Sequence, residues 1–186
     1  MISSRKREQL TEAAKTLFYQ QGVSRTTLAD IAHEAKIPLG NVYYYFPTRE
    51  SLVEAVIQAH IQELQTWFAR LEENPNPRER LLGLLRGAES NKEQLAAYGC
   101  PHGSLCQELD KEGEQSASTA GRMFQVYVDW ARKQFRLLGK DEEEAQDLAL
   151  DLISSLQGTF LLTNSFHSPE LLERKMKRLE TWLLSI

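Results

Sequence analysis

Four kinds of side chain that can contact DNA gather in a short stretch near the N-terminus. Asn41 can pair with adenine through two hydrogen bonds in the major groove, and the hydroxyls of Tyr43 and Tyr44 can donate to phosphates. Thr27, at an expected helix N-terminus, and Arg49, in a following turn, are placed to attract phosphate. These side chains predict a surface that binds duplex DNA.

A second group of reactive side chains consists of Cys100, His102 and Cys106. Cys100 precedes a helix expected from Ser104, whose N-terminal dipole favours a thiolate, and His102 is close in the sequence. Two interpretations of Cys100 stay open: a sensor of oxidants or electrophiles, or a small buried residue that fixes the helix entry. The spacing matches no common zinc site and a fourth ligand is missing, so no metal is expected.

The composition is that of an ordinary globular protein. The chain has 186 residues, of which 41% are hydrophobic and 26% are charged. No apolar run approaches the roughly 20 residues that a membrane span needs, and no secretory signal opens the sequence. With only two cysteines, a disulfide framework is not expected, and the reducing cytoplasm is the expected compartment.

Charge is distributed unevenly along the chain. Residues 1–50 carry seven basic and five acidic side chains, whereas the rest carries fifteen basic and twenty-one acidic ones. A mildly basic N-terminal head (residues 1–50) is followed by an acidic body (residues 51–186). This asymmetry suggests that the two parts of the chain have different functions, with nucleic acid as the partner of the head.

The elements that would position the DNA-contacting side chains are two short helices. Thr26 or Thr27 serves as an N-cap, with Asp30 arranged as in a capping box. A turn over Lys36 and Ile37 follows, and Pro38 suits the first turn of a helix that ends near Phe46. Two helices joined by a tight turn form a helix-turn-helix.

The remainder of the chain is predicted to be helical as well, which makes the fold all-α with about nine helices. No stretch shows the period of a strand, and apolar stripes at helical spacing recur throughout. The main helices outside the head are expected over residues 48–71, 78–95, 120–138, 141–163 and 169–185. No phosphate-binding glycine loop, nucleophile elbow or recognisable carboxylate pair is present, so neither enzymatic activity nor a cofactor is predicted.

The motifs Thr26–Ala32, Gly40–Phe46 and Arg49–Leu52 resemble the N-terminal domain of the TetR family of bacterial transcriptional regulators. The length, the helix number and the order of a small head before a larger body agree with that family. The resemblance implies a DNA-binding domain over residues 1–47 and a sensing and dimerisation domain over residues 48–186. The residues that the resemblance assigns to DNA binding are Thr27, Lys36, Leu39, Gly40, Asn41, Tyr43, Tyr44 and Arg49.

Three of these positions depart from the pattern of the family. Lys36 stands where the turn usually has glycine, and a left-handed conformation there costs on the order of 1 kcal/mol. Leu39 replaces a lysine or a small polar residue, so it is expected to touch a thymine methyl group or to pack locally. Arg49 replaces a lysine and keeps the charge.

The resemblance also implies a ligand cavity in the body and a dimer made by the last two helices. A small apolar or aromatic effector is expected, and double-stranded operator DNA and a second copy of the chain are the expected partners. The candidate ligand-binding residues are Tyr98, Cys100, His102, Met123, Phe124, Tyr127, Trp130, Gln157 and Phe160. The candidate dimer-interface residues are Leu148, Leu152, Leu156, Leu172, Met176 and Leu179.

The segment Gly99–Leu105 is similar to a Gly-Cys segment found in one subgroup of the family, where modification of the cysteine releases DNA. The expected function is therefore a ligand-responsive or electrophile-responsive regulator, a repressor that binds a palindromic operator as a homodimer. A thiol-based redox sensor acting through Cys100 is the first alternative. A helical adaptor that binds only protein is the alternative from another class, although it leaves residues 26–52 unexplained.

Overall fold

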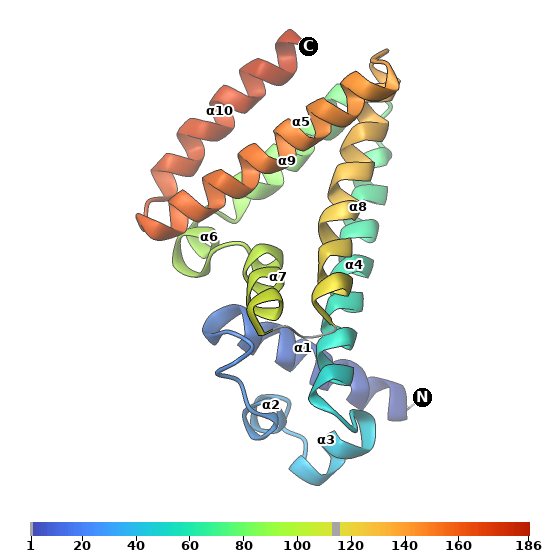
Figure 1. The fold of residues 1–186 in the computed structure, drawn as a ribbon, viewed down its shortest axis with the longest axis vertical. Helices are drawn as coiled ribbons and strands as arrows, with labels where there is room; N and C mark the ends of the chain where they lie inside the picture. Colours follow the sequence, from blue (N-terminus) through green and yellow to red (C-terminus); the bar gives the residue numbers. More distant parts are fainter. Residues whose placement is uncertain (1, 113–115) are drawn as a thin grey trace. The chain divides into compact units, whose positions relative to one another are not determined.

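The computed structural model describes residues 2–112 and 116–186, and within them the chain forms ten helices and no strand (Figure 1). The all-α prediction is confirmed. The helices are α1 (Ile2–Gln21), α2 (Leu28–Glu34), α3 (Leu39–Tyr45), α4 (Arg49–Glu72), α5 (Pro77–Ser90), α6 (Lys92–Tyr98), α7 (Pro101–Glu112), α8 (Ser116–Leu137), α9 (Glu142–Ser165) and α10 (Pro169–Ser185).

Two boundaries differ from the sequence prediction. The helix expected over residues 78–95 is interrupted at Asn91, which ends α5 and begins α6, and this adds one helix to the expected nine. The helix expected from Ser104 begins three residues earlier, because Pro101 is pre-organised for a first helical turn. Part of the polar stretch predicted over residues 112–119 lies outside the described residues.

The chain divides into two compact units that do not follow the sequence order. The first unit contains Met1–Glu63 and Pro101–Met123, and the second contains Leu64–Cys100 and Phe124–Ile186. Helix α7 therefore belongs with the N-terminal helices. This division by packing differs from the functional division predicted after residue 47, which stays a prediction.

In the first unit, α1 packs against α2 and α7, and α2 packs against α3. Gly22, at φ +89°, follows the last residue of α1 in the left-handed conformation that glycine commonly supplies at a helix C-terminus. The guanidinium of Arg7 lies 4.8 Å above the ring of Phe46, which ties α1 to the end of α3. The buried apolar residues of this unit include Leu10, Ala14, Phe18, Ile31, Ile37, Val42, Phe46, Leu52, Val56 and Leu109.

In the second unit, α10 packs against α5, α6 and α9, and α6 packs against α9. Gly83 and Gly87 lie one helical turn apart on α5, and a Cβ atom on either would collide with Leu71 or Trp67 of α4. These two glycines allow α5 to approach α4 closely. The buried apolar residues include Phe68, Leu81, Leu85, Phe135, Leu152, Leu156, Leu172, Met176, Leu179 and Leu183. No described helix combines the length and apolarity required to cross a membrane.

Candidate nucleic-acid interface and sensing site

The helix-turn-helix is held by local hydrogen bonds that the sequence predicts. Thr27 caps α2: its hydroxyl accepts from the amide of Asp30 at 3.2 Å, and the Asp30 carboxylate accepts from the amide of Thr27 at 2.8 Å. The Thr27 hydroxyl also donates to this carboxylate at 2.7 Å, and this hydrogen bond, followed by the one from the Thr27 amide, holds the pKa of the Asp30 carboxyl below its usual value. Lys36 has φ +54°, so the left-handed turn expected at this position is present with a non-glycine residue.

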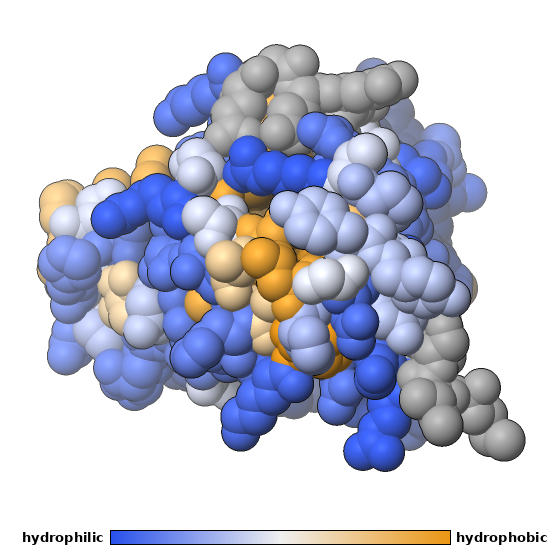
Figure 2. All heavy atoms as spheres, turned by 90° about the horizontal axis from the view of Figure 1, so that it is seen from below, coloured by the Kyte–Doolittle hydropathy of each residue, from blue (hydrophilic) through white to orange (hydrophobic). Residues whose placement is uncertain are grey.

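Helix α3 presents most of its length to solvent. Tyr43 and Tyr44 are 55% and 76% exposed, and Leu39 is also exposed, whereas Val42 faces inward and is fully buried. Asn41 is half-buried, and its backbone N–H donates to the carbonyl of Pro38 at 2.8 Å. Figure 2 views the side on which α2 and α3 lie in Figure 1, where side chains of intermediate hydropathy border an apolar centre on one side and hydrophilic side chains border it elsewhere. Two large unburied tyrosines on one short helix form a surface suited to a partner.

Arg49 contacts the protein's own backbone in this structure. Its Nη2 donates to the carbonyl of Val23 at 2.6 Å, and its buried Nε has no hydrogen-bond partner among the described residues. Arg49 thus ties the beginning of α4 to the turn between α1 and α2. Its predicted contact with a phosphate stays a prediction.

Several predicted ligand-binding residues meet in an aromatic cluster in the second unit. Trp130 stacks on Phe68 at a centroid separation of 4.4 Å and an interplanar angle of 8°, and Tyr127 meets Phe68 edge-on at 5.4 Å. Phe124 lies 6.4 Å from Tyr127. Phe68 is not among the predicted ligand-binding residues, although it follows Trp67 on the apolar stripe of α4.

The electrostatics of the cluster connect it to Cys100. Burial, with a further contribution from Cys100, raises the pKa of the Tyr127 phenol well above its usual range, so this phenol stays protonated. The indole nitrogen of Trp130 is buried and has no hydrogen-bond partner in residues 2–112 and 116–186. A donor left without an acceptor in an aromatic setting is the kind of group that a ligand can satisfy.

The other predicted ligand-binding residues are distributed more widely. Tyr98 ends α6, and Gln157 and Phe160 lie on α9 in the second unit. His102 and Met123 belong to the first unit, so each unit holds part of the predicted set. Their membership in one site stays a prediction.

His102 instead pairs with a residue that the sequence analysis did not single out. The rings of His60 on α4 and His102 on α7 meet edge-on with centroids 4.8 Å apart. Burial, followed by the positive charge of Lys15, lowers the pKa of His60 to about 4. Burial, then His60 and then Lys15, lowers the pKa of His102 to about 3. Both rings are therefore neutral at pH 7. Within the described ranges, no group of three His, Cys, Asp or Glu side chains is placed to hold a metal ion.

Comparison with known proteins agrees with the helix-turn-helix geometry. The sequence model of the family described as "Bacterial regulatory proteins, tetR family" matches residues 10–56, the part that contains α2 and α3. A transcriptional regulator of helix-turn-helix type from Lactococcus lactis, encoded in the lacX 3′ region, is 27% identical, with 94% of this chain and 91% of that protein covered.

Residues 10–56 of this chain form a DNA-binding domain of the TetR family. The activity of the chain is therefore that of a DNA-binding transcriptional regulator rather than of an enzyme. The repressor KstR2 of Mycobacterium tuberculosis is 35% identical, but only over 52% of this chain and 50% of that protein. A TetR transcriptional regulator from Legionella pneumophila has the same fold over 94% of this chain and 95% of its own, with a TM-score of 0.83 at 21% identity.

Most of the predicted dimer residues lie inside the single chain, and their place in an interface stays a prediction. Leu152, Leu156, Leu172, Met176 and Leu179 are buried inside the single chain, and Leu148 is partly buried. Side chains that already form the core of the chain offer little area to a second copy. The exposed residues of the same two helices are a different set.

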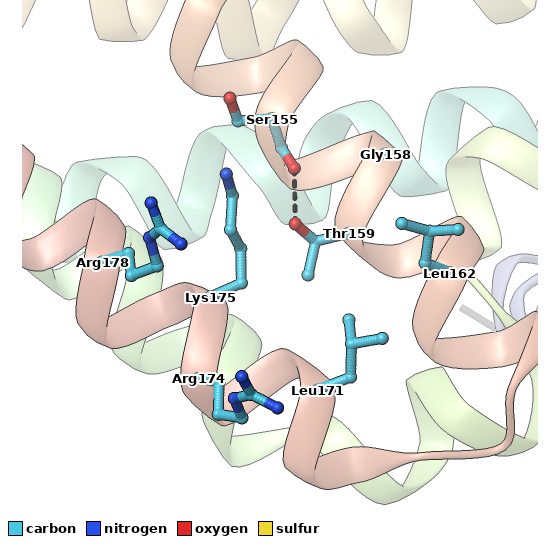
Figure 3. Close-up of a pocket in the computed structure, with 8 residues that line it drawn as sticks. All are labelled: Ser155, Gly158, Thr159, Leu162, Leu171, Arg174, Lys175 and Arg178. Carbon is cyan, nitrogen blue, oxygen red and sulfur yellow. Dashed lines mark hydrogen bonds between the residues drawn. The ribbon is translucent and has the colours of Figure 1, made fainter.

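Some of those exposed residues line a groove between α9 and α10. The groove has a volume of about 520 Å³, and its lining residues are Ser155, Gly158, Thr159, Leu162, Leu171, Arg174, Lys175 and Arg178 (Figure 3). In Figure 3 the three cationic side chains all come from α10, and Leu162 and Leu171 lie together at one end. Leu150, Leu161 and Leu162 on α9 are roughly half exposed. The single chain therefore leaves large apolar side chains of α9 uncovered.

Replacing Gly40 with alanine is expected to stabilise the fold and to weaken the binding of the chain to DNA. A Cβ atom on Gly40 would meet no atom within 4 Å, so the gain in helix propensity raises the free energy of unfolding by roughly 0.5–1 kcal/mol. If α3 approaches DNA at this position, the added methyl group costs about 1–3 kcal/mol of binding free energy.

Urea unfolding and DNA-binding titrations check these two opposite effects. The matched control is Gly121→Ala, because Gly121 is also helical, lies on α8 and leaves the same open space. The control should gain stability without losing affinity. Equal affinities for the Gly40→Ala variant and the wild type would remove Gly40 from the DNA-contacting set.

Proposed function

We propose that this chain is an effector-responsive repressor that binds a palindromic operator as a homodimer. The observation that carries the proposal is the solvent-exposed face of α3, where Leu39, Tyr43 and Tyr44 stand on a helix whose opposite side is fixed in the core. Asn41 would read adenine from this helix, while Tyr43 and Tyr44 would contact phosphates. Repression is proposed because KstR2, to which half of this chain is similar, is described as a repressor.

A second copy is the proposed occupant of the α9–α10 face. The apolar stripe of Leu150, Leu161 and Leu162 is uncovered, and a two-fold axis through it would join two pairs of helices in a bundle. Charge complementarity supports this arrangement, because Arg174 and Arg178 are exposed on α10 and Asp147 and Asp151 are exposed on α9. Two recognition helices held about one DNA turn (~34 Å) or somewhat further apart require a palindromic operator.

The aromatic cluster suggests the class of the effector. A flat aromatic molecule could stack beside Phe68 and Tyr127 and accept a hydrogen bond from the indole nitrogen of Trp130, which lacks a partner within the described residues. Such a ligand would weaken operator binding only as far as its affinity differs between the DNA-binding form and the released form.

Covalent modification of Cys100 is the alternative input. Cys100 is half-buried and directly precedes the first residue of α7, where the helix dipole favours a thiolate. Its electrostatic influence on Tyr127 supports a place beside the aromatic cluster. An electrophile that adds to the sulfur would therefore alter the cluster and the start of α7 together.

Selection from a random DNA pool tests the function and separates the two inputs. The reduced wild-type chain and the Cys100→Ser variant are each selected with and without prior treatment with N-ethylmaleimide. Enrichment of a palindrome by untreated protein is the expected result, and enrichment of nothing by either chain would favour the adaptor hypothesis. If treatment abolishes enrichment for the wild type alone, Cys100 is the input; if it changes neither chain, a non-covalent effector is favoured.

A further inference from the structure

The turn between α1 and α2 holds a carboxylate from a distant helix. Glu108 of α7 accepts hydrogen bonds through one oxygen, Oε2, from the backbone amides of Val23 at 2.7 Å and Ser24 at 3.3 Å. Successive amides that converge on one anion form a backbone nest, and its hydrogen bonds to a charged acceptor are stronger than those between neutral groups. The nest and its carboxylate lie 85 residues apart in the sequence.

Gly22 makes the approach of this carboxylate possible. Its φ of +89° turns the next amides toward α7, and a Cβ atom would lie 2.9 Å from Oε1 and 3.0 Å from Oε2 of Glu108. Only a residue without a side chain fits both the backbone conformation and the carboxylate. Gly22 therefore serves the contact with Glu108 in addition to ending α1.

Both backbone polar groups of Val23 form hydrogen bonds with side chains of other helices. Its amide donates to Glu108 of α7, and its carbonyl accepts from Arg49 of α4 at 2.6 Å. The side chain of Val23 is itself buried, with 1% of its surface exposed. Four residues later Thr27 caps α2, the first helix of the helix-turn-helix. These contacts restrain the segment between Val23 and Thr27. A displacement of Glu108 would therefore displace α2 as well.

Helix α7 is anchored where it carries this carboxylate. Leu105 and Leu109, which flank Glu108 on the helix, are buried, and α7 packs against α1. We infer that Glu108 is a positioning residue through which α7 holds the helix-turn-helix in the orientation that binds operator DNA. This inference rests on the proposed operator binding. Through Glu108, α7 contacts the turn that precedes the helix-turn-helix directly, without α4 as an intermediary.

The test compares Glu108→Ala, which removes the acceptor, with Glu108→Gln, which keeps one neutral acceptor oxygen. The control is Asp110→Asn, which removes a carboxylate from an exposed position two residues further along α7. Hydrogen-exchange mass spectrometry of the segment containing Val23 and Ser24 reports the contact without DNA. Titration with the DNA enriched by the wild-type chain reports its consequence.

We expect faster exchange in this segment and about tenfold weaker operator binding for Glu108→Ala, an intermediate effect for Glu108→Gln, and wild-type behaviour for Asp110→Asn. Unchanged exchange in the Glu108→Ala variant would overturn the contact. Faster exchange with unchanged operator affinity would overturn the positioning role. If the wild-type chain enriches no DNA, the proposed function fails, and the exchange data still decide whether the contact exists.

Discussion

A chain carrying both Leu161→Glu and Leu162→Glu is expected to be monomeric and to bind the operator at least about 100-fold more weakly than the wild type. The two leucines are 59% and 46% exposed in the single chain, so glutamate at these positions leaves the core of the protomer intact. In a two-fold symmetric interface each change occurs twice, and four carboxylates would then face an apolar contact. Loss of the second half-site accounts for the weaker operator binding.

Analytical ultracentrifugation and a titration with the selected operator measure the two parts of this prediction. Leu137→Glu is the matched control, since Leu137 is equally exposed but lies at the end of α8, away from the α9–α10 groove. A double variant that sediments as a dimer would exclude this face as the interface. A monomer that retains full affinity would show that operator binding does not require a dimer that contacts two half-sites.

Acidification from pH 7.5 to pH 5 is expected to destabilise the native chain through the His60–His102 pair. In the unfolded chain both imidazoles have a pKa near 6.5, whereas burial lowers the pKa of His60 to about 4 and that of His102 to about 3. The unfolded state therefore binds more protons than the native state in this range, and stability falls as the pH drops.

The expected loss is large compared with the total stability of a small protein. Stability is fully present above the unfolded pKa of about 6.5, and the contribution of His60 is lost by about pH 4. The whole shift corresponds to a loss on the order of 3 kcal/mol for His60 alone, of which roughly 2 kcal/mol falls between pH 6.5 and pH 5. Protonation of either ring also places a positive charge beside the other ring and near Lys15, which opposes protonation of the second.

Urea unfolding at a series of pH values from 8 to 4.5 gives the pH dependence directly. His60→Gln should remove a large part of it, and His33→Gln, which changes an exposed histidine on α2, serves as the control. A pH dependence that survives in His60→Gln and in His102→Gln would show that other groups cause it.

Local features of the fold follow from the sequence because the groups responsible are neighbours along the chain. The capping box joins Thr27 to Asp30, and the left-handed turn falls at Lys36 as the motif predicts. The exposed tyrosines of α3 follow from the helical spacing around the buried Val42. In each of these cases, separations of a few residues contain the information.

Features that depend on contacts between residues far apart in the sequence could not be predicted from the sequence in the same way. The contact of Glu108 with the turn after Gly22 and the meeting of His60 with His102 both depend on where α7 packs. The burial of the predicted dimer residues could not be predicted either, because a leucine stripe such as Leu152 and Leu156 has the same spacing whether it faces its own core or a partner. Which stripe stays exposed is decided by the packing of α10 on α5 and α9.

The discontinuous make-up of the first unit has a consequence for engineering. A DNA-reading head cut from this chain after α3 or within α4 would lack α7, although residues Pro101–Met123 belong to the same compact unit. Such a transplant would leave the amides of Val23 and Ser24 without their carboxylate and would uncover the apolar surface that Leu105 and Leu109 cover. Chimeric regulators with altered operator preference should therefore be assembled by grafting both segments, or by exchanging only the exposed residues of α3.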